Sequence, residues 1–278
     1  MEETERAAST ANLMQGDILE LIGQGFDFNL ATIINADCDM QNSKHDGMVA
    51  ILPIYTFHRY LEKFWLPGFF LRQRNEAVSL LRTVVELPDR HVEDLVEWIK
   101  SDSNPRINIK AESIFSGKSL DGKKMEKANT AIHKLVDVMD AEIRGTLSSV
   151  GLFAPKEEEK AKKYYRDQVV EAKKQMGDGN FFVTDIKGHA EIGYVVRMRR
   201  IYTLPIEACF TSNSECQALN RDGLAAFRIS KFTANYKFKV SQLFAHQYSR
   251  IGLPDEITAL SELAVMDAVQ KLQGEFHG

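Results

Sequence analysis

The feature that most constrains the fold of this chain is the position of its β-strand patterns, which lie in two groups far apart in the sequence. Residues 14–56 contain three short apolar runs separated by turn residues, and residues 180–232 contain three more. Residues 57–179 show instead the apolar spacing of amphipathic helices, most clearly over Lys123–Val150. Because a few short strands leave a costly open sheet edge, neither group is expected to fold alone. The sequence therefore predicts an α+β protein with one β-barrel split by a helical insertion.

The predicted elements follow the order strands, helices, strands, helices. The expected barrel strands are Ile18–Ile22, Ala31–Asn35, Met48–Ile54, Phe181–Ile186, Ile192–Leu204 and Leu224–Phe232. Lys156–Met176 is expected to be a charged, mostly exposed helix. Residues 233–278 are expected to add C-terminal helices, at Lys237–Arg250 and Asp255–Leu272. The whole chain, 1–278, is predicted to be a single domain, with two separate domains as the alternative.

Composition limits the classes of protein to which the chain can belong. Its 278 residues carry a net charge of −4, so no overall field attracts it to nucleic acid or to a membrane. No apolar run approaches the roughly 20 residues that cross a bilayer, and the acidic, polar N-terminal residues are unlike a signal or transit peptide. The cysteines lack the CxxC spacing of a zinc site, and their odd number disfavours a disulfide framework. These features predict a cytoplasmic location and no membrane partner.

Three segments of the N-terminal part carry a recognisable pattern. They are Gln15–Leu19 at the first strand, Ala31–Asp37 through the second and Val49–Ile54 through the third. Together they resemble the start of the MazF/PemK toxin family, and the resemblance implies an SH3-like β-barrel. The ribonuclease members carry Arg-Pro just before the second strand, where this chain has Asn29-Leu30. The resemblance therefore implies the family's fold and not its ribonuclease site.

The loop expected between the second and third strands, Asp37–Gly47, holds the densest cluster of reactive side chains. On an extended segment, residues two apart face the same way, so Asp37 and Asp39 could bind one divalent ion, Mg²⁺ or Mn²⁺. Lys44 would neutralise a phosphate and His45 would support the metal, which together would make a metal-dependent nuclease. The alternative is that the two aspartates cap a tight turn at a solvated hairpin tip.

Cys38 lies between the two aspartates, whose negative charge raises the pKa of a neighbouring thiol and disfavours a nucleophilic thiolate. We therefore expect Cys38 to be a small buried residue that points away from the aspartates. The Asp-Cys-Asp loop also resembles uncharacterised bacterial proteins, some of them encoded near mobile or defence loci.

Positively charged residues gather in the second half of the chain. The candidates for contact with a nucleic-acid backbone are Arg197, Arg199, Arg200, Arg228 and Lys231. Strand alternation is expected to put Arg197 and Arg199 on one face, close to Tyr194 and Tyr202, and such interleaving of arginine and aromatic residues can stack bases. The alternative is an ordinary exposed barrel face, or a basic middle that pairs with the acidic ends of the chain.

Two hypotheses of function follow. In the first, the protein is a bacterial interaction module of a toxin–antitoxin or defence-type system, without a cofactor. It would bind a protein partner or nucleic acid through the barrel and the arginine-rich strand. In the second, it is a metal-dependent nuclease that uses Asp37 and Asp39 with Mg²⁺ or Mn²⁺. The first ranks higher because the sequence offers no third clear carboxylate for the metal. The sequence gives no oligomeric state.

Overall fold

The computed structural model describes residues 2–8, 10–23, 25–85, 89–101, 114–115, 120–220 and 223–248. The chain separates into two compact units. The barrel unit comprises Met1–Pro53, Asp178–Phe181 and Arg197–Gly278, and the helical unit comprises Ile54–Gly177 and Phe182–Val196. The fold is α+β, as predicted, while the single domain stays a prediction. The predicted helix Asp255–Leu272 and the end of Lys237–Arg250 lie outside the described residues.

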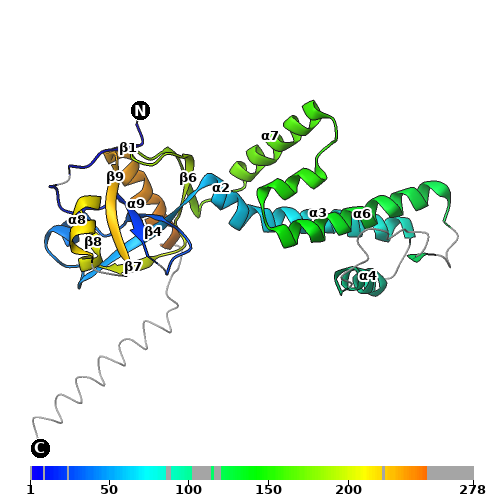
Figure 1. The fold of residues 1–278 in the computed structure, drawn as a ribbon, viewed down its shortest axis with the longest axis horizontal. Helices are drawn as coiled ribbons and strands as arrows, with labels where there is room; N and C mark the ends of the chain where they lie inside the picture. Colours follow the sequence, from blue (N-terminus) through cyan, green and yellow to red (C-terminus); the bar gives the residue numbers. More distant parts are fainter. Residues whose placement is uncertain are drawn as a thin grey trace, which may run out of the picture. The chain divides into compact units, whose positions relative to one another are not determined.

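The strands of the barrel unit form a nearly closed antiparallel β-barrel (Figure 1). They are β1 (Thr4–Glu5), β2 (Asp17–Ile22), β3 (Leu30–Ile33), most of β4 (Met48–Thr56), β7 (Tyr202–Pro205), β8 (Cys209–Phe210) and β9 (Ala225–Phe232). Their order is β1-β9-β2-β3-β4, with β7 paired to β4 and the short β8 running parallel to β9. The SH3-like identity of this barrel stays a prediction.

Strands from the two distant strand groups lie side by side, as the open-edge argument predicted. β2 pairs with β9 in antiparallel register, from Asp17 opposite Lys231 to Ile22 opposite Ala225. On β2 both Ile18 and Leu19 are fully buried, although they point to opposite faces of the strand. β2, between β9 and β3, is therefore covered on both of its faces at these two residues.

The predicted strand Ile192–Leu204 is wrong, because it is interrupted. The structure has β6 (Ile192–Arg197) and β7, with a turn between them. Both pair with β4: Ile54 lies opposite Val196, and Ile51 lies opposite Tyr202. Two residues of β4, 52 and 53, thus face five residues, 197–201, so three extra residues leave the ladder. Residue 53 is a proline, which has no N–H to donate, and the ladder is interrupted there.

The barrel unit also contains four helices among its described residues: α1 (Asp37–Gln41), η4 (Ile206–Ala208), α8 (Asn213–Leu219) and α9 (Ala234–Tyr248). Ser212 begins α8 by accepting a hydrogen bond from the backbone N–H of Glu215, as an N-cap serine does. The prediction of a helix after the last strand is confirmed by α9, which starts three residues before the predicted Lys237.

The helical unit is built mainly from α3 and α6, which lie side by side (Figure 1). Its elements are α2 (Phe57–Tyr60), the π-helix η1 (Leu61–Trp65), α3 (Leu66–Val85), α4 (Asp89–Ser101), α6 (Gly122–Arg144), η3 (Leu147–Phe153), α7 (Glu158–Lys174), and most of the strands β5 (Asn180–Asp185) and β6. Leu81, Ile132 and Leu135 are fully buried in the core between these helices. Asp121 caps the start of α6, and Gly145, with φ of 60°, ends it before the predicted Val150.

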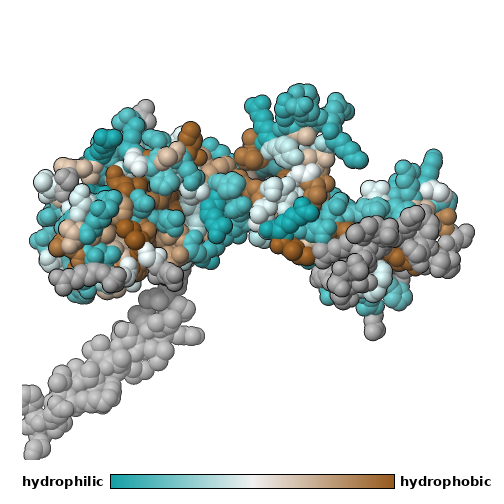
Figure 2. All heavy atoms as spheres, in the orientation of Figure 1, coloured by the Kyte–Doolittle hydropathy of each residue, from teal (hydrophilic) through white to brown (hydrophobic). Residues whose placement is uncertain are grey.

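The surface over α7 is mostly hydrophilic (Figure 2), which confirms the predicted charged and exposed helix. Within the part of the chain that the structure describes, none of the helices has the length and apolar character needed to cross a bilayer.

Candidate functional site

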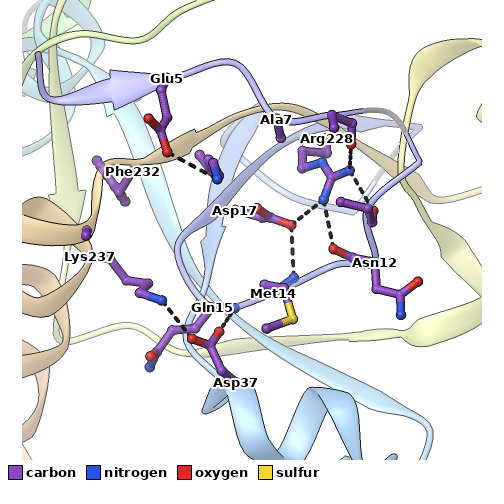
Figure 3. Close-up of a pocket in the computed structure, with 14 residues that line it drawn as sticks. Glu5, Ala7, Asn12, Met14, Gln15, Asp17, Asp37, Arg228, Phe232 and Lys237 are labelled. Atoms are coloured by element: carbon purple, nitrogen blue, oxygen red, sulfur yellow. Dashed lines mark hydrogen bonds and ion pairs between the residues drawn. The ribbon is translucent and has the colours of Figure 1, made fainter.

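A pocket of about 330 Å³ opens in the barrel unit between the N-terminal segment, β9 and α9 (Figure 3). It is lined by three cations and three carboxylates that form three ion pairs. The pairs are Arg228 with Asp17, Lys231 with Glu5, and Lys237 with Asp37. Three of the sequence-predicted site residues, Asp37, Arg228 and Lys231, therefore meet in one place.

The deepest of the three pairs joins Arg228 to Asp17. Nη1 of Arg228 lies 2.9 Å from Oδ2 of Asp17, and each side chain is only 2% exposed. The same oxygen accepts a hydrogen bond from the backbone N–H of Met14 at 2.9 Å. Burial raises the pKa of the Asp17 carboxyl, against the lowering effect of the bonds from Arg228 and Met14. The predicted position of Arg228 on an exposed basic face is wrong, because its guanidinium is buried.

A β-bulge places Arg228 on the pocket side of β9. Ser230 lies opposite Ile18, but Arg228 lies opposite Leu19, so Ile229 is the extra residue at the bulge. A shift of one residue moves a side chain to the other face of a strand. Arg228 therefore shares the face of Asp17 and does not share that of Ser230. The alternation of the sequence alone cannot reveal this register change.

The two outer pairs lie nearer the surface. Nζ of Lys231 is 3.1 Å from Oε1 of Glu5, and both side chains are nearly half exposed. Nζ of Lys237 is 2.7 Å from Oδ2 of Asp37, whose other oxygen accepts the backbone N–H of Gln15 at 3.0 Å. The stem of Lys237 lies across Gly16, where a Cβ atom would approach Cγ of the lysine to 2.9 Å. Lys237 is therefore positioned by its contact with Gly16, and Asp37 by its hydrogen bond from Gln15, in addition to their ion pair.

The predicted metal site at Asp37 and Asp39 rests on an extended backbone, and that premise is wrong. Both residues belong to the α1 helix. Helical residues two apart point about 200° apart around the axis, so their carboxylates do not converge. Both oxygens of Asp37 already accept hydrogen bonds, and Asp39 does not line the pocket. Among the described residues, no group of three or more His, Cys, Asp or Glu side chains is arranged to hold a metal ion.

The other residues of the predicted nuclease site follow α1 in a turn that does not reach the pocket. Lys44 is exposed and His45 is half buried. Ser43 and Asp46 have positive φ angles of 54° and 48°, which suits the tight hairpin tip that the sequence analysis kept as an alternative. The predicted burial of Cys38 is wrong, because this cysteine is exposed on α1.

The three cysteines differ in accessibility, and this gives a first testable prediction. Burial raises the pKa of the Cys209 thiol to about 12, and Glu207 adds to the effect. Burial also raises the pKa of Cys216, which is 1% exposed. We expect Ellman's reagent at mildly alkaline pH to react quickly with Cys38 alone in the native protein, and with the other two only after unfolding. Cys38→Ser should remove the fast phase; a fast phase that survives this substitution would contradict the burial of the other two thiols.

The predicted arginine-rich strand forms a turn in the structure. Arg197 is the last residue of β6, whereas Arg199 and Arg200 lie beyond it and are exposed. We call Met198–Arg200 the arginine turn. The expectation that Arg197 and Arg199 share one strand face is therefore wrong. None of the three arginines lines the pocket.

Two hydrogen bonds attach the arginine turn to the end of α9. Nε of Arg199 donates to Oε1 of Gln247 at 3.0 Å, and the hydroxyl of Tyr248 donates to the carbonyl oxygen of Met198 at 3.3 Å. No sequence motif marks Gln247 or Tyr248 as part of a site. Glu5, Asp17 and Lys237 could not be predicted as pocket residues either, since their pairing depends on long-range contacts between the two ends of the barrel unit.

The two tyrosines expected beside the arginines have different environments. Tyr194 is fully buried in the helical unit, and its hydroxyl donates to the carbonyl oxygen of Glu191 at 2.8 Å. Burial raises the pKa of this tyrosine to about 12. Tyr202 is half buried in the barrel unit, where its ring contacts Phe26 and Phe28 at centroid distances of 5.3 and 4.9 Å. Only Tyr202 has an exposed part that a base could reach.

Fold and site together define an α+β protein with a nearly closed antiparallel β-barrel and a polar pocket lined by paired charges. Comparison of the chain with protein-family models, with curated proteins and with solved structures gives no match. The relation to the MazF/PemK family therefore stays a prediction.

Proposed function

We propose that this protein is a binding module for nucleic acid, and that the arginine turn and the outer face of α9 form its contact surface. The observation that carries the proposal is the attachment of the turn to α9, which presents Arg199 and Arg200 to solvent beside a helix. Arginine donates to phosphate oxygens through a planar group that needs no particular base sequence.

The composition of α9 supports the same proposal. The helix contains no aspartate or glutamate, so its surface has no side chain that repels a phosphate. Its exposed positions include Lys239 and Phe238, and Phe238 is 67% exposed. Single-stranded nucleic acids are bound by stacking bases on exposed aromatic rings beside basic groups, and Phe238 and Lys239 supply one of each.

The arginine turn is tested by measuring binding of the full chain to a short, fluorescently labelled, single-stranded oligonucleotide. Arg199→Gln/Arg200→Gln should weaken binding by roughly tenfold at low salt, because two phosphate contacts are lost. The slope of log K against log salt should fall by about 1.4 for the same reason. Lys163→Gln/Arg166→Gln on the exposed face of α7 is the matched control and should leave both quantities unchanged.

Phe238→Ala separates stacking from charge in the same assay. It should weaken binding while leaving the salt slope unchanged, since no charge is removed. Tyr165→Ala is its control, because Tyr165 is a 42% exposed aromatic residue on α7. The proposal fails if the wild-type chain does not bind the oligonucleotide, or if the control and turn variants weaken binding equally.

The nuclease hypothesis is tested by the same protein and oligonucleotide. Cleavage with Mg²⁺ or Mn²⁺ that is lost in Asp37→Ala/Asp39→Ala and in EDTA would favour that alternative over a binding module. Asp37→Ala on its own removes the partner of Lys237, so the variant Asp39→Ala is the cleaner probe.

A protein partner and a role in a toxin–antitoxin or defence-type system remain predictions from the sequence. One structural feature favours a protein partner as the second candidate. α7 exposes the apolar residues Tyr165, Val169 and Val170, each more than 40% exposed, on an otherwise charged helix.

A further inference from the structure

The N-terminal segment of the barrel unit covers one side of the pocket and is held there by oxygen atoms. We call the described residues between Thr4 and Met14 the strap. At its start, β1 pairs with β9, with Glu5 opposite Lys231. Further along, three of its backbone carbonyl oxygens accept hydrogen bonds from Arg228: those of Ala8, Ala11 and Asn12, at 2.7, 2.8 and 2.9 Å (Figure 3). The strap therefore faces the pocket with a carboxylate and three carbonyl oxygens.

The strap also balances the charge of the pocket. Arg228, Lys231 and Lys237 carry three positive charges, and Glu5, Asp17 and Asp37 carry three negative ones. Of these six charged groups the strap contributes one, the carboxylate of Glu5. Without the strap, the remaining groups would carry three positive and two negative charges, and Arg228 would keep Asp17 as its one described acceptor. Donors of Arg228 and Lys231 would then be open to another anion.

We infer that the strap is an internal occupant of a second phosphate-binding site formed by Arg228, Lys231 and Lys237. Its oxygens stand where the oxygens of a phosphate group would bind. The bonds from Arg228 to these carbonyl oxygens already have a charged donor; a phosphate would add a charged acceptor, and pairs of arginine with phosphate are frequently bidentate. The strap thus competes with phosphate ligands and keeps the site closed. This inference takes its ligand class, phosphate groups, from the proposed function, but it concerns a different surface from the arginine turn.

Two features weaken the attachment of the strap near Glu5, whereas Thr4 and Leu13 at its two ends are buried. β1 is a strand of only two residues, so few ladder bonds hold it to β9. The ion pair between Glu5 and Lys231 is nearly half exposed, and pairs of this kind contribute little to stability. The pair between Arg228 and Asp17 does not involve a strap side chain and would persist after the strap leaves.

The inference is tested with sodium tripolyphosphate, which carries phosphate groups without bases, by titration calorimetry on the full chain. Glu5→Gln removes the acid of the strap and should tighten binding by about two- to fivefold. Glu207→Gln is the matched control: it makes the same change in net charge at an exposed position of the same unit, and should have no such effect. Adding Lys231→Gln to Glu5→Gln should abolish the gain.

Hydrogen exchange supplies the second readout. Tripolyphosphate should speed exchange of the strap amides in the wild-type chain, because the ligand displaces the strap's carbonyl oxygens from Arg228 and so detaches the segment that carries those amides. The inference is overturned if Glu5→Gln does not tighten binding relative to Glu207→Gln, or if strap exchange does not rise. The Glu5→Gln effect should persist in Arg199→Gln/Arg200→Gln. If the wild-type chain does not bind the oligonucleotide but still shows the Glu5→Gln effect with tripolyphosphate, the proposed function is rejected and the strap inference stands.

Discussion

Arg228→Met is expected to lower the free energy of unfolding of the barrel unit by about 3–5 kcal/mol, the range for removing one partner of a buried ion pair. The substitution leaves Asp17 buried without its cation and leaves three strap carbonyl oxygens without their donor. Urea denaturation followed by far-ultraviolet circular dichroism measures the loss. Tryptophan fluorescence is not the probe here, because Trp65 and Trp98 both belong to the helical unit.

The effect of Arg228→Met should depend on pH with a definite sign. Burial already raises the pKa of Asp17 in the folded chain, and loss of the guanidinium raises it further. Above the folded pKa the ionised carboxylate carries the full cost of burial. As the pH falls towards the ordinary aspartate pKa of about 4, the folded state takes up a proton and the cost declines. The difference between variant and wild type should therefore be largest near neutral pH and smaller in acid.

The matched control for this substitution is Arg6→Met. Arg6 lies in the same N-terminal segment and is exposed. Removing an exposed charge usually changes stability by less than about 0.5 kcal/mol. An equal loss in both variants would contradict a structural role for the buried ion pair, as would a loss at Arg228 that does not diminish in acid.

The barrel strands could be predicted from the sequence because their burial alternates or is complete, and both patterns are visible in single segments. Pairing of the two strand groups followed from the cost of open edges, and the register of β2 on β9 agrees with it. The interruption of Ile192–Leu204 could not be predicted from that segment alone. Its cause lies on another strand, where Pro53 of β4 cannot donate to the ladder.

The candidate site was harder to predict. Which of its side chains meet depends on a short helix and a one-residue bulge, and neither can be recognised from the sequence pattern. A five-residue helix turns Asp37 away from Asp39. Acidic residues suit the first turn of a helix because of the helix dipole, so the same residues fit a helix start as well as a loop. A one-residue bulge moves Arg228 from one face of β9 to the other. Arg199 and Arg200 are exposed, and their role as nucleic-acid contacts stays a prediction. The turn that presents them could not be predicted, since it depends on contacts with Gln247 and Tyr248.

The helical unit allows the cleanest stability test, because one helix carries the same residue type in two opposite environments. Ile132 and Ile143 both belong to α6; Ile132 is fully buried, and Ile143 is 69% exposed. Ile132→Ala should lower the free energy of unfolding by about 2–5 kcal/mol, through lost burial and the cavity left behind. Ile143→Ala should change it by less than about 0.5 kcal/mol. Helix propensity changes identically in the two variants, so the difference isolates packing.

Trp65 and Trp98 make fluorescence the suitable probe for both isoleucine variants, since both lie in the helical unit. Similar losses in the two variants would mean that α6 does not bury Ile132 in solution.

The Ile132→Ala variant also tests whether the nucleic-acid contact surface lies on the barrel unit alone. The arginine turn and α9 belong to the barrel unit, so Ile132→Ala, at a temperature where it is folded, should bind the oligonucleotide as the wild type does. Weaker binding by the folded variant would place part of the contact surface on the helical unit, and α7 would then be the first surface to mutate.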